Sequence, residues 1–213
     1  QDIYTAKVGK KILDSVSNKQ NLVAKINQAT KWSEVCGTSF YKISWNSNLG
    51  QVIALEENGR KITTGEVDIS VCSPFEIYPD SSTHESLEDC QSIIHAKAYT
   101  TTEIKQIYGV DVEGKDINGY SLDGNFSLGG LGLSGLSTKL IETTRSNSAI
   151  VIEKYIKPNE EYPEGRLIII AGDKLVFDGE FPFKNGVDGN KEYPFVKQVC
   201  NQEVGSFWGV SMI

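Results

Sequence analysis

The spacing of apolar residues along the first 36 positions follows the period of an α-helix. Leu22, Ile26 and Ala29 recur every three to four residues, with lysine and polar residues between them. Such a stripe is typical of an amphipathic helix that packs one face against a core. Residues 15–20 are almost entirely polar and interrupt the pattern. We therefore predict an N-terminal helical segment over 1–36, divided into two helices.

After this segment the period changes to two. Residues 40–45 and 51–56 contain many aromatic or branched aliphatic side chains, and residues 66–71 alternate cleanly between polar and apolar positions. This alternation is typical of half-buried strands. Asn58-Gly59 provides the two positive-φ positions of a tight hairpin turn. The pattern predicts an antiparallel β meander.

The meander is expected to end in a further strand and a short helix. Residues 92–99 are largely apolar, and a capping-box pattern follows, with Thr100 as the cap and Glu103 three positions later. Gly109 then ends the helix, because glycine adopts the left-handed conformation of a C-terminal cap at little cost. We assign the meander and the helix to one segment, 37–109.

Residues 110–147 carry the weakest structural signal. Within them, positions 124–138 contain five glycines and no charged residue. Ordering such a segment costs much backbone entropy and buries little apolar surface. We predict a flexible Gly-rich insertion over 110–147.

Strand patterns return over 148–213. Residues 149–156 form an apolar run, and Gly172-Asp173 lies between two further runs as a two-residue hairpin loop. Residues 195–199 are expected to form another strand. The chain is therefore predicted to be α+β: N-terminal helices are followed by a mostly antiparallel β meander and a second β-hairpin region.

Charge and the chain ends limit the possible functions. The net charge is −7, and lysines and arginines are scattered along the sequence. A protein that grips nucleic acid through phosphates needs clustered basic residues, so this composition disfavours a DNA clamp. No apolar run is long enough to span a membrane. Because the chain lacks an initial Met and ends in an apolar run, we expect it to be a fragment cut at both ends.

The four cysteines show no metal or disulfide framework. Their spacing contains no Cys-x-x-Cys pair, which favours buried, reduced thiols. A zinc site is the alternative, but its spacing fits no zinc finger or ribbon. Its four ligands would be Cys72, His84, Cys90 and His95.

An acidic motif offers a nuclease alternative. Pro79-Asp80 followed by Glu103 and Lys105 mimics a metal-dependent nuclease of the PD-(D/E)xK type, in which two carboxylates hold a divalent cation and a lysine positions the attacking water. In that class the second carboxylate and the lysine project from a buried strand. Here the corresponding residues, Glu103 and Lys105, are expected at the start of a helix. The capping role of Glu103 explains it without catalysis.

Two other motifs have structural explanations. Residues 130–135 match the dinucleotide-binding glycine pattern and Glu153 lies where a ribose-binding acid would follow, but no hydrophobic strand precedes the glycines. His95 is expected to be a hydrogen-bonded strand residue, and no Gly-x-Ser-x-Gly nucleophile motif is present. We predict no catalytic residue, no metal ligand and no cofactor.

Three blocks, collinear along the chain, resemble portal proteins of tailed bacteriophages and prophages. They lie at 36–42 (CGTSFYK), 73–80 (SPFEIYPD) and 205–209 (GSFWG). Each pairs aromatic residues with a glycine or proline at a bend. Apart from an insertion around 118–147, the resemblance covers nearly the whole chain. Further matches lie at 65–67, 155–172 and 193–196.

The resemblance implies a non-enzymatic structural subunit. It corresponds to the wing region of a portal, without the stem helix and the clip that in this family follow the last block. The family forms a homo-oligomeric ring, usually a dodecamer, through which double-stranded DNA passes without sequence-specific binding. The implied partners are terminase, capsid and head-tail connector proteins, with no membrane. The implied locations are the virion and, during assembly, the host bacterial cytoplasm. An unrelated β-rich binding module and the nuclease remain the alternatives.

Overall fold

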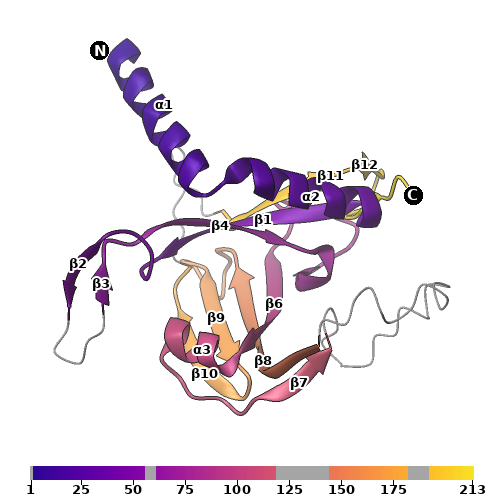
Figure 1. The fold of residues 1–213 in the computed structure, drawn as a ribbon. Helices are drawn as coiled ribbons and strands as arrows, with labels where there is room; N and C mark the ends of the chain where they lie inside the picture. The colour runs from indigo at the N-terminus through magenta and orange to yellow at the C-terminus, as the bar shows by residue number, and fades with distance from the viewer. Residues whose placement is uncertain (1, 56–60, 119–143, 182–191) are drawn as a thin grey trace. The chain divides into compact units, whose positions relative to one another are not determined.

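The computed structural model describes residues 2–55, 61–118, 144–181 and 192–213 (Figure 1). The chain forms two compact units. Unit 1 comprises residues 1–74, 82–87 and 194–213, and unit 2 comprises residues 75–81 and 88–193. The predicted α+β class is confirmed, because helices and antiparallel sheets occur together. The division into two units differs from the four consecutive segments expected from the sequence.

Unit 1 begins with two helices. Helix α1 spans Asp2–Lys19 and helix α2 spans Leu22–Cys36. Asn21 separates them in the left-handed conformation, with a φ of 47°, a conformation that asparagine adopts more readily than most residues. The predicted break in the helical segment is therefore present, at the end of the polar run.

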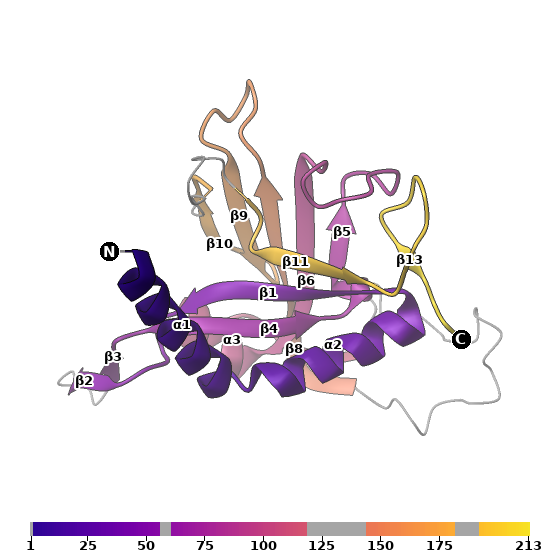
Figure 2. The ribbon, with the colours of Figure 1, turned by 90° about the horizontal axis from the view of Figure 1, so that it is seen from above.

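A three-stranded antiparallel sheet forms the centre of unit 1. Strand β1 (Thr38–Asn46) pairs with β4 (Glu66–Cys72) on one side and with β11 (Phe195–Val199) on the other. Helix α2 runs along this sheet (Figure 2) and buries Ala29 and Ser33. Phe40, at the buried end of β1, is fully enclosed.

The region between β1 and β4 is not the simple meander that the sequence predicted. Strands β2 (Val52–Leu55) and β3 (Lys61–Thr63) form a separate two-stranded hairpin, and β1 pairs directly with β4. The predicted Asn58-Gly59 turn lies outside the described residues. The short strands β12 (Asn201–Gln202) and β13 (Gly209–Val210) form another pair.

Unit 2 contains a six-stranded antiparallel sheet. Its strands follow the order β10-β9-β8-β6-β5, and β7 pairs with β8. A short 3-10 helix, η1 (Pro74–Glu76), precedes β5. The strands are β5 (Ile77–Pro79), β6 (Ser92–Thr100), β7 (Lys115–Asn118), β8 (Thr144–Ile156), β9 (Arg166–Ala171) and β10 (Lys174–Gly179).

Helix α3 (Thr101–Tyr108) packs on this sheet and has the predicted capping box. The Glu103 amide donates to the Thr100 hydroxyl at 3.2 Å, and the Glu103 carboxylate accepts from the Thr100 amide at 2.8 Å. Hydrogen bonding to the Thr100 backbone is the main reason that the pKa of Glu103 is lowered. Gly109 ends the helix, as predicted.

Part of the predicted Gly-rich insertion is ordered. Strand β7 lies within it, and β8 begins at Thr144, five residues before the expected return to order at Ala149. β7 pairs with the first residues of β8, Thr144–Ser148, and this extension before the predicted strand 149–156 depends on that pairing. Residues 119–143, which include the glycine motif at 130–135, lie outside the described residues.

Candidate functional site

The acidic motif that favours a nuclease is explained residue by residue in unit 2. The Asp80 carboxylate accepts from the backbone amides of Gln91 and Ser92, at 2.9 and 3.2 Å. It therefore holds the start of β6. Lys105 forms an exposed ion pair with Asp111 at 2.8 Å, and Glu103 caps α3.

These residues are not brought together. Asp80 binds at Ser92, the first residue of β6, whereas Glu103 binds at Thr100, the last residue of the same strand. Eight residue steps along a strand correspond to about 26 Å. A cation that binds two carboxylates directly holds their oxygens about 2 Å from itself. Asp80 and Glu103 therefore do not form the metal site that the sequence alternative required.

We expect no nuclease activity from this chain. The physical reason is the separation of Asp80 from Glu103 along β6. Incubating the protein with double-stranded DNA and Mg²⁺ or Mn²⁺, and resolving the products on a gel, should give no cleavage above a protein-free control. Cleavage that disappears in an Asp80→Ala variant would contradict this expectation.

None of the four cysteines, all in the described part of the chain, forms a disulfide. Cys72 and Cys90 are buried, and Cys36 and Cys200 are half-buried. Burial, followed by the charge of Asp80 and a hydrogen bond to it, raises the pKa of the Cys90 thiol to about 12. Cys90 therefore remains a neutral thiol at physiological pH. The predicted burial holds for Cys72 and Cys90, whereas Cys36 and Cys200 are only half-buried.

The raised pKa of Cys90 predicts a pH-dependent stability. Because the folded pKa lies above the value of about 9 for an unfolded thiol, the neutral thiol stabilises the fold below pH 9. That contribution is lost as pH rises from 9 towards 12. We expect the urea midpoint to fall between pH 8 and pH 11 more steeply for the native protein than for a Cys90→Ala variant. Equal slopes would contradict the assignment of the raised pKa to Cys90.

The main buried polar cluster of unit 2 is centred on the carboxylate of Glu153 in β8. His95 in β6 lies directly opposite in the strand register, and its Nδ1 is 2.8 Å from the Glu153 carboxylate. The Tyr155 hydroxyl donates to the same carboxylate at 3.0 Å, and the Tyr108 hydroxyl from α3 approaches it at 3.5 Å. The side chains of His95 and Glu153 are only 2% and 8% exposed.

A second carboxylate lies on the other side of the histidine ring. Glu76 Oε2 is 3.8 Å from His95 Nε2 and 3.9 Å from the ammonium of Lys97.

Burial, followed by the charge of Glu153, raises the pKa of the Tyr108 hydroxyl, which therefore remains a donor at neutral pH. The polar atoms of His95, Tyr155 and Tyr108 are directed at the Glu153 carboxylate, so the role that this geometry supports is structural: these contacts join β6, β8 and α3. Glu76 Oε2 differs, because it is buried without a hydrogen-bond partner among the described residues.

The sequence identified only part of this cluster. His95 was predicted to be a hydrogen-bonded strand residue, and this is confirmed. Glu153 was considered only as a possible ribose-binding acid. The signal for its actual role was a single acidic residue inside the apolar run 149–156, since a carboxylate in a buried strand requires donors around it. Which donors surround it depends on the pairing of β6 with β8.

In unit 1 the block at 36–42 and the block at 205–209 pack against each other. Gly37 ends α2 with a φ of 83°, and a Cβ at this position would lie 2.0 Å from the carbonyl oxygen of Gly209. The Gly209 amide donates to the Thr38 hydroxyl at 2.7 Å across 171 residues of sequence. Phe40 and Phe207 stack with their ring centroids 5.9 Å apart. The two blocks therefore form one structural junction, which requires glycine at both close positions.

A lysine in the same unit holds this junction to neighbouring loops. Lys197 in β11 donates to the carbonyl oxygens of Glu85 and Phe207, and its ammonium lies 4.5 Å from the centroid of the Phe207 ring. The Phe207 amide in turn donates to the Ser82 carbonyl at 2.9 Å. Segment 82–87 is thus tied to the last block through Lys197 and Phe207.

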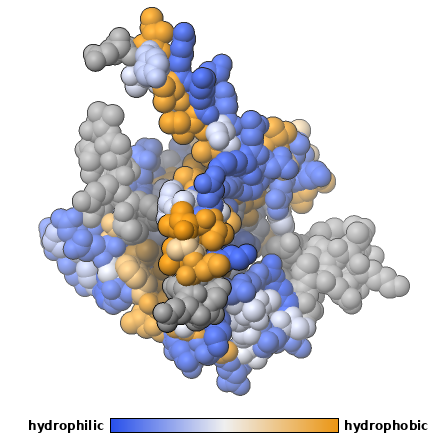
Figure 3. All heavy atoms as spheres, turned by 60° about the vertical axis from the view of Figure 1, so that its left-hand side comes forward, coloured by the Kyte–Doolittle hydropathy of each residue, from blue (hydrophilic) through white to orange (hydrophobic). Residues whose placement is uncertain are grey.

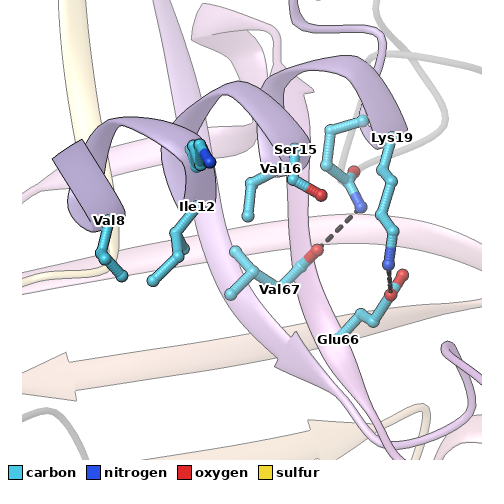
Figure 4. A pocket seen from close by; sticks show the side chains of 9 residues that line it. Val8, Ile12, Ser15, Val16, Lys19, Glu66 and Val67 are labelled. Atoms are coloured by element: carbon cyan, nitrogen blue, oxygen red, sulfur yellow. Dashed lines mark hydrogen bonds and ion pairs between the residues drawn. The ribbon is translucent and has the colours of Figure 1, made fainter.

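Helix α1 lies beside a hollow in unit 1 (Figure 4). Val8, Ile12 and Val16 line the helix side of this hollow, and Val67 of β4 faces them. Its volume is about 310 Å³. At its polar end, Gln20 donates to the Val67 carbonyl at 2.7 Å, and Lys19 pairs with Glu66. The hollow is mostly apolar, which suits contact with another apolar surface better than catalysis.

No protein-family model matches the chain, and no curated protein is significantly similar to it. Among the described helices, none combines the length and the apolar composition that crossing a membrane requires.

Proposed function

We propose that this chain is a structural subunit of the portal ring of a tailed phage or prophage and forms part of its wing region. The ring is the conduit at one capsid vertex through which DNA enters during packaging and leaves during ejection. The observation that carries the proposal is the junction of the portal-like blocks at 36–42 and 205–209 in unit 1.

Contact between these blocks supports the resemblance for a physical reason. Unrelated short matches have no reason to meet in three dimensions. Here the two blocks are linked by the close approach of Gly37 to Gly209, by the bond from the Gly209 amide to Thr38 and by the stacking of Phe40 on Phe207. The residues that carry the resemblance are thus the residues that fix the path of the backbone.

The electrostatics are also compatible with a conduit. A net charge of −7 repels DNA phosphates, and a channel through which DNA must move benefits from weak binding. In the described part of the chain, the hydrogen bonds of Glu153 and Asp80 hold strands together. A scaffold function requires no further chemistry from them.

The proposed partners follow from the same resemblance. They are copies of the same chain in a ring, usually twelve, together with terminase, capsid and head-tail connector proteins. Double-stranded DNA passes through the ring. The protein would then reside in the virion and, before assembly, in the host bacterial cytoplasm.

The proposal is tested by isolating the protein from the cells or particles that produce it. An affinity tag placed on its gene allows gentle purification, and negative-stain electron microscopy then shows the assembly. We expect a closed ring with one rotational axis, because head-to-tail contacts between identical subunits close into rings. A monomer throughout the purification, or a tight two-fold dimer, would contradict the proposal.

A further inference from the structure

Two of the four cysteines lie at the point in unit 1 where helix α2 passes into strand β1. Cys36 is the last residue of α2, and Cys200 directly follows β11. The Cys200 amide donates to the carbonyl oxygen of Gly37 at 2.9 Å. This bond continues the antiparallel pairing of β11 with β1 by one residue. Cys200 therefore lies opposite Gly37, the residue that follows Cys36 in the chain.

The Cys36 side chain belongs to the face of α2 that contacts β11. Thr30, Ser33 and Cys36 are spaced three residues apart, so they share one face of the helix. On that face the side-chain amide of Gln198 in β11 donates to the hydroxyls of Thr30 and Ser33, at 3.2 and 3.4 Å. Cys36, the next residue of this row, is therefore directed at the strand one step beyond Gln198.

The Cys200 side chain belongs to the matching face of the strand. Gln198 and Cys200 are two residues apart, and side chains at that spacing point to the same face of a strand. Helix α2 and strand β11 run side by side in the same direction (Figure 2). One step beyond the contact of Gln198 with Ser33, the helix reaches Cys36 and the strand reaches Cys200. The two thiols are therefore directed at each other.

We propose that Cys36 and Cys200 are a redox-sensitive pair that closes into a disulfide under oxidising conditions. Residues directly opposite each other in an antiparallel pair have Cα atoms about 4.5–5.5 Å apart, and a disulfide spans about 4.4–6.8 Å between its Cα atoms. Cys36 adjoins the residue opposite Cys200, so the bond needs no large movement of the backbone. Both thiols are half-buried, whereas Cys72 and Cys90 are buried. An oxidant therefore reaches the proposed pair more readily.

A small-molecule disulfide such as oxidised glutathione supplies the oxidising equivalents. Burial raises the pKa of the Cys36 thiol, which favours Cys200 as the first nucleophile. The Cys200 thiolate attacks one sulfur of the oxidant, forms a mixed disulfide and releases one glutathione thiolate. The Cys36 thiolate then attacks the Cys200 sulfur and releases the second glutathione thiolate. Two protein thiols become one disulfide, their two protons pass to the released thiolates, and one glutathione disulfide is reduced to two thiols.

The disulfide would join α2 to β11 beside the junction of the blocks at 36–42 and 205–209. It closes a loop that contains most of the chain, and closing a long loop restricts the unfolded state. We expect oxidation to raise the urea midpoint of unit 1, followed by tryptophan fluorescence, by about 1–2 M. In a reducing cytoplasm the pair stays as two thiols, and it closes when the protein meets oxidising surroundings. This inference does not depend on the proposed function.

Peptide mapping after mild oxidation tests the pairing. The protein is treated with oxidised glutathione, its remaining thiols are blocked with N-ethylmaleimide, and it is digested with trypsin. Cleavage after lysine places Cys36 in peptide 32–42 and Cys200 in peptide 198–213, whereas the other two cysteines share peptide 62–97. Mass spectrometry therefore distinguishes the proposed disulfide from every other pairing within the chain.

Copies of the chain must be kept apart during the oxidation. Figure 3 shows apolar atoms exposed along helix α1, and such surfaces can bring copies together at high concentration. The reaction is therefore run at low micromolar concentration, and a non-reducing gel verifies that the product has the mass of one chain. Cys200→Ser, which replaces the thiol sulfur by oxygen, is the matched control. Circular dichroism verifies that this variant is folded.

We expect the oxidised native protein to yield peptides 32–42 and 198–213 joined by a disulfide, and to show a raised urea midpoint that a reducing agent reverses. Cys200→Ser should show neither the joined peptides nor the rise. Absence of the joined peptides, glutathione adducts on both cysteines in their place, a link to peptide 62–97 or a disulfide between two chains would overturn the inference. So would an equal rise of the midpoint in Cys200→Ser. The mapping of the native protein decides the pairing even if the variant does not fold.

Discussion

Replacement of Gly37 by alanine is expected to unfold unit 1 at much lower denaturant concentration than the native protein. The new Cβ would lie 2.0 Å from the Gly209 carbonyl oxygen, a backbone atom that no side-chain rotation can move away. Alanine also disfavours the φ of 83° at this position. The two effects together predict a loss of about 3–5 kcal/mol of unfolding free energy.

Substitutions at two other glycines separate the two causes of the lost stability, which are the backbone strain at positive φ and the close contact of the new Cβ. Gly205 has a φ of 73° with open space around its Cβ position, so Gly205→Ala should cost only about 1–2 kcal/mol. Gly9 lies within α1 with no atom within 4 Å of its Cβ position, so Gly9→Ala should stabilise the helix by about 0.5–1 kcal/mol.

Tryptophan fluorescence during urea unfolding measures this series directly. All three tryptophans, Trp32, Trp45 and Trp208, lie in unit 1. The expected order of midpoints is Gly9→Ala, native protein, Gly205→Ala and Gly37→Ala, from highest to lowest. If Gly37→Ala were as stable as Gly205→Ala, the close packing of the two portal-like blocks would be disproved.

Removal of the Glu153 carboxylate is expected to destabilise unit 2 by a similar amount. Glu153→Ala would leave His95, Tyr108 and Tyr155 without the acceptor that they share. Loss of one partner from a buried charged cluster typically costs about 3–5 kcal/mol. Glu153→Gln keeps the shape and one acceptor oxygen, so its cost should be smaller, about 1–3 kcal/mol.

Hydrogen exchange of the β6 and β8 amides is the appropriate readout, because unit 2 contains no tryptophan. Glu160→Ala is the matched control, since Glu160 is an exposed glutamate that follows β8. The Glu160→Ala substitution should change the unfolding free energy by no more than about 0.5 kcal/mol. Exchange that is as slow in Glu153→Ala as in the control would show that the cluster does not hold the sheet together.

The elements predicted correctly from the sequence are those specified by neighbouring residues. The capping box of α3 needs only Thr100 and Glu103, and both of its hydrogen bonds are present. The hairpin of β9 and β10 needs only the Gly172-Asp173 loop between two apolar runs. In both, the partners lie close in sequence, so a local pattern contains the necessary information.

The features that the sequence did not specify depend on distant partners. The direct pairing of β1 with β4 requires that β2 and β3 leave the sheet, which their strand-like composition cannot indicate. The glycines of the blocks at 36–42 and 205–209 were recognisable, but the hydrogen bond that joins the two blocks, from Gly209 to Thr38, spans 171 residues. The environment of Glu153 depends in the same way on the register of β6 against β8.

The most direct test of the portal proposal is the position of this protein on the phage particle. Antibody fragments raised against unit 2 and labelled with gold can be applied to particles from the source, before and after mild disruption, and viewed by electron microscopy. We predict gold at one vertex of each capsid, the vertex that carries the tail. Label at every vertex, along the tail or on no particle would contradict the proposal.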